Sequence, residues 1–265
     1  MAREDTLPGL VLRNAQVRPT KPAIREKDLG IWRTYSWIEY AREVTEFGDG
    51  LAAMGFGPGD KLVVIGDNRP RLYWAQVAAQ GLGGSAVPVY QDSIAQEMGF
   101  VLADADTKIV VAEDQEQVDK ILSIKDQIPT LEYVIYDDSR GMAHYDNPIL
   151  RSFPDVQELG RGKAGAYEKS VDALDPESIA LMSYTSGTTG NPKGVMLSHN
   201  NLLETAKTFV ANEDVRESDD FLSYLPMAWV GEGLFGLTVS VFTGCSTNCP
   251  EAPETLERDL RELGP

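Results

Sequence analysis

The sequence contains few of the residues that most often carry metal or disulfide chemistry. Its 265 residues include only two cysteines and two histidines. Cys245 and Cys249 stand at C-x-x-x-C spacing, which is neither the C-x-x-C of redox and zinc motifs nor a disulfide framework. We expect both to be ordinary thiols. We also expect His144, in a polar segment, to be solvated, and His199 to be a helix-start residue and not a catalytic base.

Basic residues are scarce as well. The chain has 24 lysines and arginines against 41 acidic residues, so its formal net charge is −17. Nucleic acids and anionic membranes both favour clustered positive charge. The composition therefore argues against nucleic acid and against simple electrostatic docking to a membrane. It leaves room for one local cationic site.

Long hydrophobic runs are also lacking. The longest weakly charged stretch, 221–244, is broken by Pro226 and Glu232. Its uncharged pieces are shorter than the roughly 20 residues that span a bilayer. The first residues are polar and lack the apolar core of a signal peptide. The sequence thus predicts a cytoplasmic protein without a transmembrane segment.

What the sequence does contain is a regular alternation of short apolar strands and helices. A Ser-x-x-Glu capping box at 36–39 predicts a helix over 37–54. Further helices are expected at 69–82, 94–103, 115–127, 200–211, 233–242 and 253–263. Strands are expected at 61–66, 85–90, 108–112, 132–136, 179–184, 194–197 and 221–225. The predicted fold class is α/β, with mainly parallel sheets covered by helices on both faces. The polar segment 137–169 is expected to be irregular.

One loop has the composition of a polyphosphate-binding site. Residues 185–195, T-S-G-T-T-G-N-P-K-G-V, combine four hydroxyls, three glycines and one lysine. Glycines let backbone amides turn toward an anion, hydroxyls donate further hydrogen bonds, and a lysine adds a point charge. A Walker A loop is excluded, because Pro192 precedes Lys193 and Gly194 follows it.

With Tyr184 in front of it, this loop resembles the signature of the adenylate-forming, or AMP-binding, enzymes and matches it at every position. The resemblance covers essentially the whole chain and is closest to the N-terminal part of bacterial long-chain acyl-CoA synthetases. Further similar segments are Y-S-W at 35–37, P-G-D-K at 58–61, G-D-N-R-P at 66–70 and S-H-N-N-L at 198–202.

The resemblance implies an AMP-forming acid–thiol ligase that uses ATP, Mg²⁺ and coenzyme A. A carboxylic acid, a fatty acid or another hydrophobic acid, would first become an acyl-adenylate and then an acyl-CoA. By the family pattern Thr185 lies near the phosphates and the Mg²⁺ ion. The β- and γ-phosphates would be held by Ser186, Gly187, Thr188, Thr189, Gly190 and Lys193.

A second family element, L-P-M-A-W-V-G-E at 225–232, borders the acid pocket in long-chain members. Trp229 stands where many of them have histidine. A tryptophan there could wall a shorter or aromatic substrate, or it could belong to the core. Trp229 and Glu232 are the candidate pocket residues.

The resemblance also implies an incomplete N-terminal domain. Residues 1–265 would form a truncated AMP-binding domain, in which 57–214 is a first α/β subdomain. Residues 1–56 and 215–265 would begin a second, and the C-terminal lid domain would be absent. Such a fragment lacks the family's ribose, metal and catalytic lysine contributors, so we expect it to be inactive alone. The alternative is a non-catalytic nucleotide- or acid-binding module. The oligomeric state is left open.

Two other patterns are interpreted as functionally silent. The G-x-G-x-x-G at 231–236 does not open directly from a strand, as a dinucleotide-binding loop does, and is expected to be a chance match. Three acidic pairs, at 113–114, 137–138 and 219–220, are expected to lie in solvated turns and not to bind metal.

Overall fold

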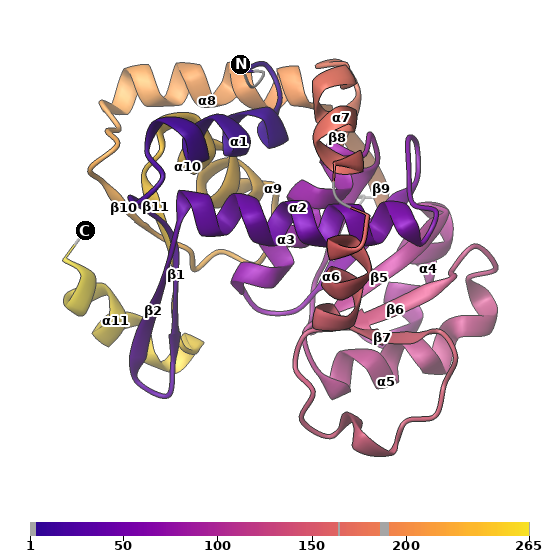
Figure 1. Ribbon diagram of the computed structural model, residues 1–265. Helices are drawn as coiled ribbons and strands as arrows, with labels where there is room; N and C mark the ends of the chain where they lie inside the picture. Colours follow the sequence, from indigo (N-terminus) through magenta and orange to yellow (C-terminus); the bar gives the residue numbers. More distant parts are fainter. Residues whose placement is uncertain (1–3, 164, 186–190, 265) are drawn as a thin grey trace.

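The computed structural model describes residues 4–163, 165–185 and 191–264, which form two β-sheets and the helices around them (Figure 1). The larger sheet has seven strands in the order β7-β6-β5-β3-β4-β8-β9. They are β3 (Lys61–Ile65), β4 (Ser85–Val89), β5 (Thr107–Ala112), β6 (Tyr133–Tyr136), β7 (Leu150–Ser152), β8 (Ile179–Thr185) and β9 (Lys193–Ser198). All neighbouring pairs are parallel except β8 and β9.

The smaller sheet joins the beginning of the chain to its last third. Its order is β10-β11-β1-β2, in which β11 is parallel to β10 and β1, while β1 and β2 form an antiparallel hairpin. The strands are β1 (Pro22–Asp28), β2 (Ile31–Ser36), β10 (Asp220–Leu222) and β11 (Ser246–Cys249).

Helices lie on both faces of the larger sheet, and others surround the smaller sheet (Figure 1). The α-helices of the described ranges are α1 (Leu7–Val17), α2 (Trp37–Ala53), α3 (Pro70–Gly81), α4 (Ala95–Asp104), α5 (Gln115–Ile124), α6 (Phe153–Arg161), α7 (Ala166–Ala173), α8 (His199–Glu213), α9 (Val230–Glu232), α10 (Ser240–Thr243) and α11 (Leu256–Leu263). Short 3-10 turns at Lys125–Gln127, Met142–His144 and Pro253–Thr255, and the π-helix η3 (Gly233–Val239), complete the described elements.

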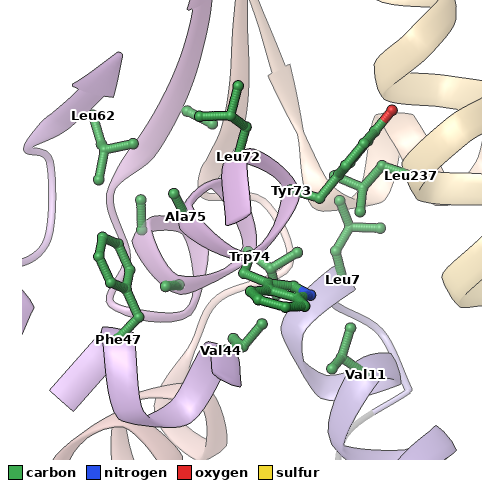
Figure 2. Close-up of a cluster of buried hydrophobic side chains, with 14 of the residues drawn as sticks. Leu7, Val11, Val44, Phe47, Leu62, Leu72, Tyr73, Trp74, Ala75 and Leu237 are labelled. Atoms are coloured by element: carbon green, nitrogen blue, oxygen red, sulfur yellow. The ribbon is translucent and has the colours of Figure 1, made fainter. Parts of the chain in front are cut away.

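The two faces of the larger sheet bury two separate hydrophobic cores. Side chains alternate along a strand, so Leu62 and Val64 of β3 pack with α2 and α3, whereas Val63 and Ile65 pack with α4 and α5. The first core extends into the smaller sheet through α1 and η3. Figure 2 shows its centre, where Trp74 of α3 lies among residues of α1 and α2. The predicted α/β class, with mainly parallel sheets and helices on both faces, is confirmed.

The predicted irregular segment is wrong, because 137–169 contains β7, α6 and the start of α7. Helix α6 begins with a second capping box, in which the Ser152 hydroxyl accepts the N–H of Asp155. Its buried Phe153 stacks on Phe47 of α2 with ring centroids 4.0 Å apart. The segment is polar because α6 has only one narrow buried face.

The opening of the chain is also more ordered than the periodicity indicates. Helix α1 has Thr6 as its N-cap, and the β1–β2 hairpin turns at Leu29 and Gly30, which both have positive φ. Leucine is rare at a turn position with positive φ, so this turn lacks the Asn-Gly or Asp-Gly pair that most clearly marks a hairpin in a sequence. The capping box at 36–39 is confirmed, with the Glu39 carboxylate accepting the Ser36 N–H at 2.8 Å.

The strands of the two sheets come from different parts of the chain. Those of the larger sheet lie within 57–214, and those of the smaller sheet lie outside that range. Helix α2, from outside the range, packs against α3 and α6. The bounds of the two subdomains stay a prediction. None of the helices in the described ranges is both long and apolar enough to cross a bilayer.

Candidate functional site

The order of the larger sheet creates a crevice at the carboxyl ends of β3 and β4. The chain starts the sheet at β3, moves to β4 on one side and then crosses to β5 on the other side of β3. Ligands of open α/β sheets bind at such a switch point, outside the carboxyl ends of the strands. The segments that follow β3 and β4 are therefore the first place to look for a site.

A cavity of about 330 Å³ lies at this point, between the two sheets. Its walls are segments that follow four parallel strands: 66–68 after β3, 89–92 at the end of β4, 223–228 after β10 and 250–253 after β11. The lining is mainly apolar, with Asn68, Gln91 and Ser223 among its polar side chains. The carboxyl ends of both sheets thus converge on one cavity.

A second cavity of about 320 Å³ adjoins the first and shares Val89, Tyr90 and Ala228 with it. It extends toward the β8–β9 hairpin, where Tyr184 and Pro192 line it. The Tyr184 hydroxyl donates a hydrogen bond to the Asp104 carboxylate at 2.7 Å. Burial and this carboxylate raise the pKa of Tyr184, so the hydroxyl stays protonated and holds the hairpin against α4.

The hairpin brings together the two ends of the glycine- and hydroxyl-rich loop. Thr185 is the last residue of β8, Lys193 is the first of β9, and the two lie opposite each other in the register. Both side chains are exposed. The remaining candidate phosphate-binding residues lie outside the described residues: Ser186, Gly187, Thr188, Thr189 and Gly190.

The two candidate acid-pocket residues lie apart from the cavity linings. Trp229 is 48% exposed and is the N-cap of the short helix α9. Glu232 is fully buried. Its carboxylate accepts hydrogen bonds from the Tyr73 hydroxyl at 2.5 Å and the Ser223 hydroxyl at 3.0 Å. Since Ser223 lines the first cavity, Glu232 supports that wall from behind.

Burial raises the pKa of Glu232 from 4.5 to about 7, although the hydrogen bonds from Tyr73 and Ser223 oppose this shift. The folded state therefore holds this proton more tightly than the unfolded chain. The protonated carboxyl therefore contributes its full stabilisation below about pH 4.5, the pKa of the unfolded chain. This contribution is lost as the pH rises through about 7, the pKa in the folded state. Glu232→Gln keeps the acceptor oxygen but cannot ionise. We expect the stability of this variant relative to the wild type to increase by about 2 kcal/mol between about pH 5 and pH 7.

Urea denaturation of both proteins at several pH values measures this difference, since all other titrating groups are shared and cancel. A difference in unfolding free energy that stays constant with pH would show that Glu232 titrates normally.

The sequence predictions did not identify Arg69 and Arg71, which lie at the N-terminal end of α3. Glu113 and Asp137, expected in solvated turns, are both mostly buried: Glu113 accepts from Arg69 at 3.0 Å, and Asp137 from Arg71 at 2.6 Å. That expectation is wrong for these two residues, because α3 directs its first turn at the ends of β5 and β6. The G-D-N-R-P motif at 66–70 marked this turn but did not indicate what its side chains contact.

The remaining patterns lie at the expected places in the fold, and their lack of function stays a prediction. Gly233 and Gly236 of the G-x-G-x-x-G match lie in the π-helix η3 and not in a strand-to-helix turn. His199 is the first residue of α8, after the N-cap Ser198. Cys245 and Cys249 are free and buried.

The sequence of this chain is similar to those of known proteins over most of its length. A family model described as AMP-binding enzyme matches residues 11–265. A long-chain-fatty-acid–CoA ligase, ACSBG2 of Xenopus laevis, is 28% identical over 253 residues, which are 92% of this chain and 34% of the relative. ACSBG1 of Bos taurus is 28% identical over 249 residues, 90% of this chain and 34% of the relative. The chain thus spans about a third of the length of these curated relatives.

Solved structures show the same fold. The anthranilate CoA ligase AuaEII in complex with anthranoyl-AMP superposes with a TM-score of 0.83 at 21% identity, covering 98% of this chain and 48% of that one. The N-terminal domain of FACL13 from Mycobacterium tuberculosis superposes with a TM-score of 0.80 at 25% identity, covering 99% of this chain and 61% of that one.

Proposed function

The chain belongs to the family of AMP-binding enzymes, and from this we propose that it is the N-terminal part of an ATP-dependent carboxylic acid–CoA ligase. The observation that carries the proposal is the pairing of Thr185 with Lys193 on the β8–β9 hairpin. This hairpin presents both ends of the complete signature loop beside the second cavity, which adjoins the cavity at the carboxyl ends of the two sheets.

The reaction would proceed in two steps. A carboxylate oxygen attacks the α-phosphorus of ATP, and the bond to pyrophosphate breaks, leaving an acyl-adenylate. The thiol of coenzyme A then loses its proton and attacks the acyl carbonyl, and AMP leaves as the thioester forms. A carboxylate is a poor acyl donor until its oxygen becomes part of such a leaving group. The protein contributes positioning and charge stabilisation to both steps.

The loop residues have distinct roles in this proposal. Lys193 would neutralise the β- and γ-phosphates, and Thr185 would lie near the metal and the phosphates. Within the described ranges, no group of three or more His, Cys, Asp or Glu side chains could hold a metal ion. Mg²⁺ bound to nucleotides needs no such cage, because it takes most of its ligands from phosphate oxygens and water. The Thr185 hydroxyl is compatible with that mode of binding, in which the ion offsets charge on the phosphates. Amides and hydroxyls of Ser186, Gly187, Thr188, Thr189 and Gly190 would complete the phosphate contacts.

A hydrophobic acid is the proposed substrate. The first cavity is lined largely by apolar groups, including Val89, Leu225 and Met227. Relatives that match over most of this chain are long-chain-fatty-acid–CoA ligases, and a structural neighbour binds anthranoyl-AMP. Both an aliphatic and an aromatic acid are compatible with this lining. Trp229 and Glu232 stay proposed pocket residues, Glu232 acting through the wall that it supports.

The curated relatives are about three times as long as this chain. We propose that the complete reaction uses residues from the remaining two thirds, so that the 265-residue chain alone is catalytically incomplete. The alternative is a non-catalytic module that binds a nucleotide or an acid.

The products of the full-length protein separate these two functions. We expect incubation with ATP, Mg²⁺, coenzyme A and a panel of fatty and aromatic acids to yield one AMP per acyl-CoA, as detected by mass spectrometry. At least one hydrophobic acid should be converted, while acetate should not. Binding of ATP or acid without any AMP or thioester would favour the non-catalytic module.

A further inference from the structure

Two consecutive residues at the start of α3 connect the two sheets. Asn68 donates its side-chain amide to the carbonyl of Leu225 at 2.8 Å. Arg69 donates its two terminal nitrogens to the carbonyls of Pro250 and Glu251, both at 3.1 Å. The acceptors belong to the segments that follow β10 and β11, the same segments that line the first cavity.

Arg69 is also fixed to the larger sheet. Its Nε donates to the Glu113 carboxylate at 3.0 Å, and the second oxygen of that carboxylate accepts the backbone N–H of Asp67 at 2.6 Å. Burial opposes the charge of Arg69, but nearby acidic groups, Glu113 first among them, together outweigh it, and the pKa of the guanidinium is raised. Gly66 permits this arrangement, because a Cβ there would come within 2.5 Å of the Cβ of Glu113.

The guanidinium therefore uses all three of its nitrogens on three acceptors from two sheets. Its planar fork is suited to this task, since it presents several donors in fixed directions. With a side-chain exposure of only 17%, Arg69 has little water available to replace a lost partner.

We propose that Asn68 and Arg69 form an inter-sheet clamp that sets the position of the walls 223–228 and 250–253 against 66–68. The identity of the substrate in the cavity rests on the proposed function. Both residues act as positioning residues, and their effect on substrate passes through the walls that they hold.

Arg71 provides a matched control on the same helix. It also pairs with a carboxylate at the end of a strand, Asp137 after β6, and it donates to the Asp137 carbonyl as well. Both acceptor atoms belong to Asp137, which follows a strand of the larger sheet, and Arg71 is not among the residues that line the two cavities. Loss of Arg71 removes an ion pair of the same kind without loosening the link between the sheets.

Hydrogen exchange of the chain followed by mass spectrometry tests the clamp directly. Arg69→Lys keeps a charge for Glu113 but cannot reach both carbonyls, so we expect amide exchange in 250–256 to become about tenfold faster. Arg69→Met and Asn68→Ala should show the same local effect, the latter in 223–228. The melting temperature of Arg69→Lys should stay within about 3 °C of the wild type. Arg71→Met should leave exchange in both segments unchanged.

Unchanged exchange in both segments for Arg69→Met would overturn the clamp, and so would equal acceleration throughout the chain, which marks a general loss of stability.

Kinetics of the full-length protein test the positioning role. In acid-dependent exchange of pyrophosphate into ATP, Arg69→Lys should raise the KM for the acid about tenfold with kcat within about threefold of the wild type. Arg71→Met should leave both constants unchanged. Faster hydrogen exchange with an unchanged acid KM would contradict the positioning role. If the wild type shows no pyrophosphate exchange, the proposed function fails, and hydrogen exchange still decides whether the clamp exists.

Discussion

Replacement of Gly160 by alanine is expected to lower the free energy of unfolding by about 3 kcal/mol. Helices α2 and α6 pack so closely at this point that a Cβ at Gly160 would lie 1.9 Å from the Glu46 carbonyl oxygen and 2.8 Å from the Gly50 nitrogen. Both are backbone atoms of α2 and cannot rotate away. The helices would have to separate, which would open the stacked pair Phe47 and Phe153.

Gly162→Ala is the matched control, two residues further along. Gly162 has an ordinary helical φ of −76°. Among the described residues other than its chain neighbours, the Leu159 carbonyl oxygen, at 3.7 Å, is the heavy atom closest to its Cβ position. We expect its stability to stay within about 0.5 kcal/mol of the wild type. Denaturant unfolding monitored by circular dichroism measures both variants. Equal stabilities of the two would mean that α2 and α6 do not approach each other as described.

Lys193→Ala is expected to have the largest effect on activity, a reduction of about a hundredfold or more in acid-dependent pyrophosphate exchange by the full-length protein. The loss should appear in kcat and in the KM for ATP, while binding of the acid alone should be nearly unchanged. The reason is that the Lys193 ammonium would neutralise the phosphates of ATP, whereas the acid would bind in the apolar cavity.

Lys207→Ala controls for the loss of a positive charge. Lys207 lies on α8 and pairs with Glu204 at 2.6 Å on an exposed surface. Exposed pairs of this kind contribute little, so this variant should keep wild-type kinetics. An unchanged apparent ATP affinity and rate in Lys193→Ala would reject the phosphate-binding role of that residue.

Much of the larger sheet could be predicted from the sequence, because buried parallel strands such as β3 and β5 are continuous apolar runs. Strand β11 could not, since S-T-N-C is polar yet fully buried; the Asn248 amide is held by hydrogen bonds to Phe221 and Ser246. Hydrogen-bonded polar residues in a strand leave no hydrophobic pattern.

Part of the candidate site could likewise be predicted from the sequence, and part of it could not. The signature loop is local in sequence, so its type and its position between two strands could be predicted. The cavity walls are not local: Asn68 meets Leu225, and Arg69 meets Pro250, across more than 150 residues. A single sequence without structure does not show which distant carbonyls such side chains will reach. For the same reason Glu232 could be marked as a candidate, but not as a residue lying behind the wall.

Exchange of radiolabelled pyrophosphate into ATP is the most direct test of acyl-adenylate formation, because it reports the first step without coenzyme A. For the full-length protein we expect exchange that requires Mg²⁺ and a hydrophobic carboxylic acid. Absence of exchange with every fatty and aromatic acid, together with absence of ATP binding, would contradict the assignment of this chain to an acid–CoA ligase.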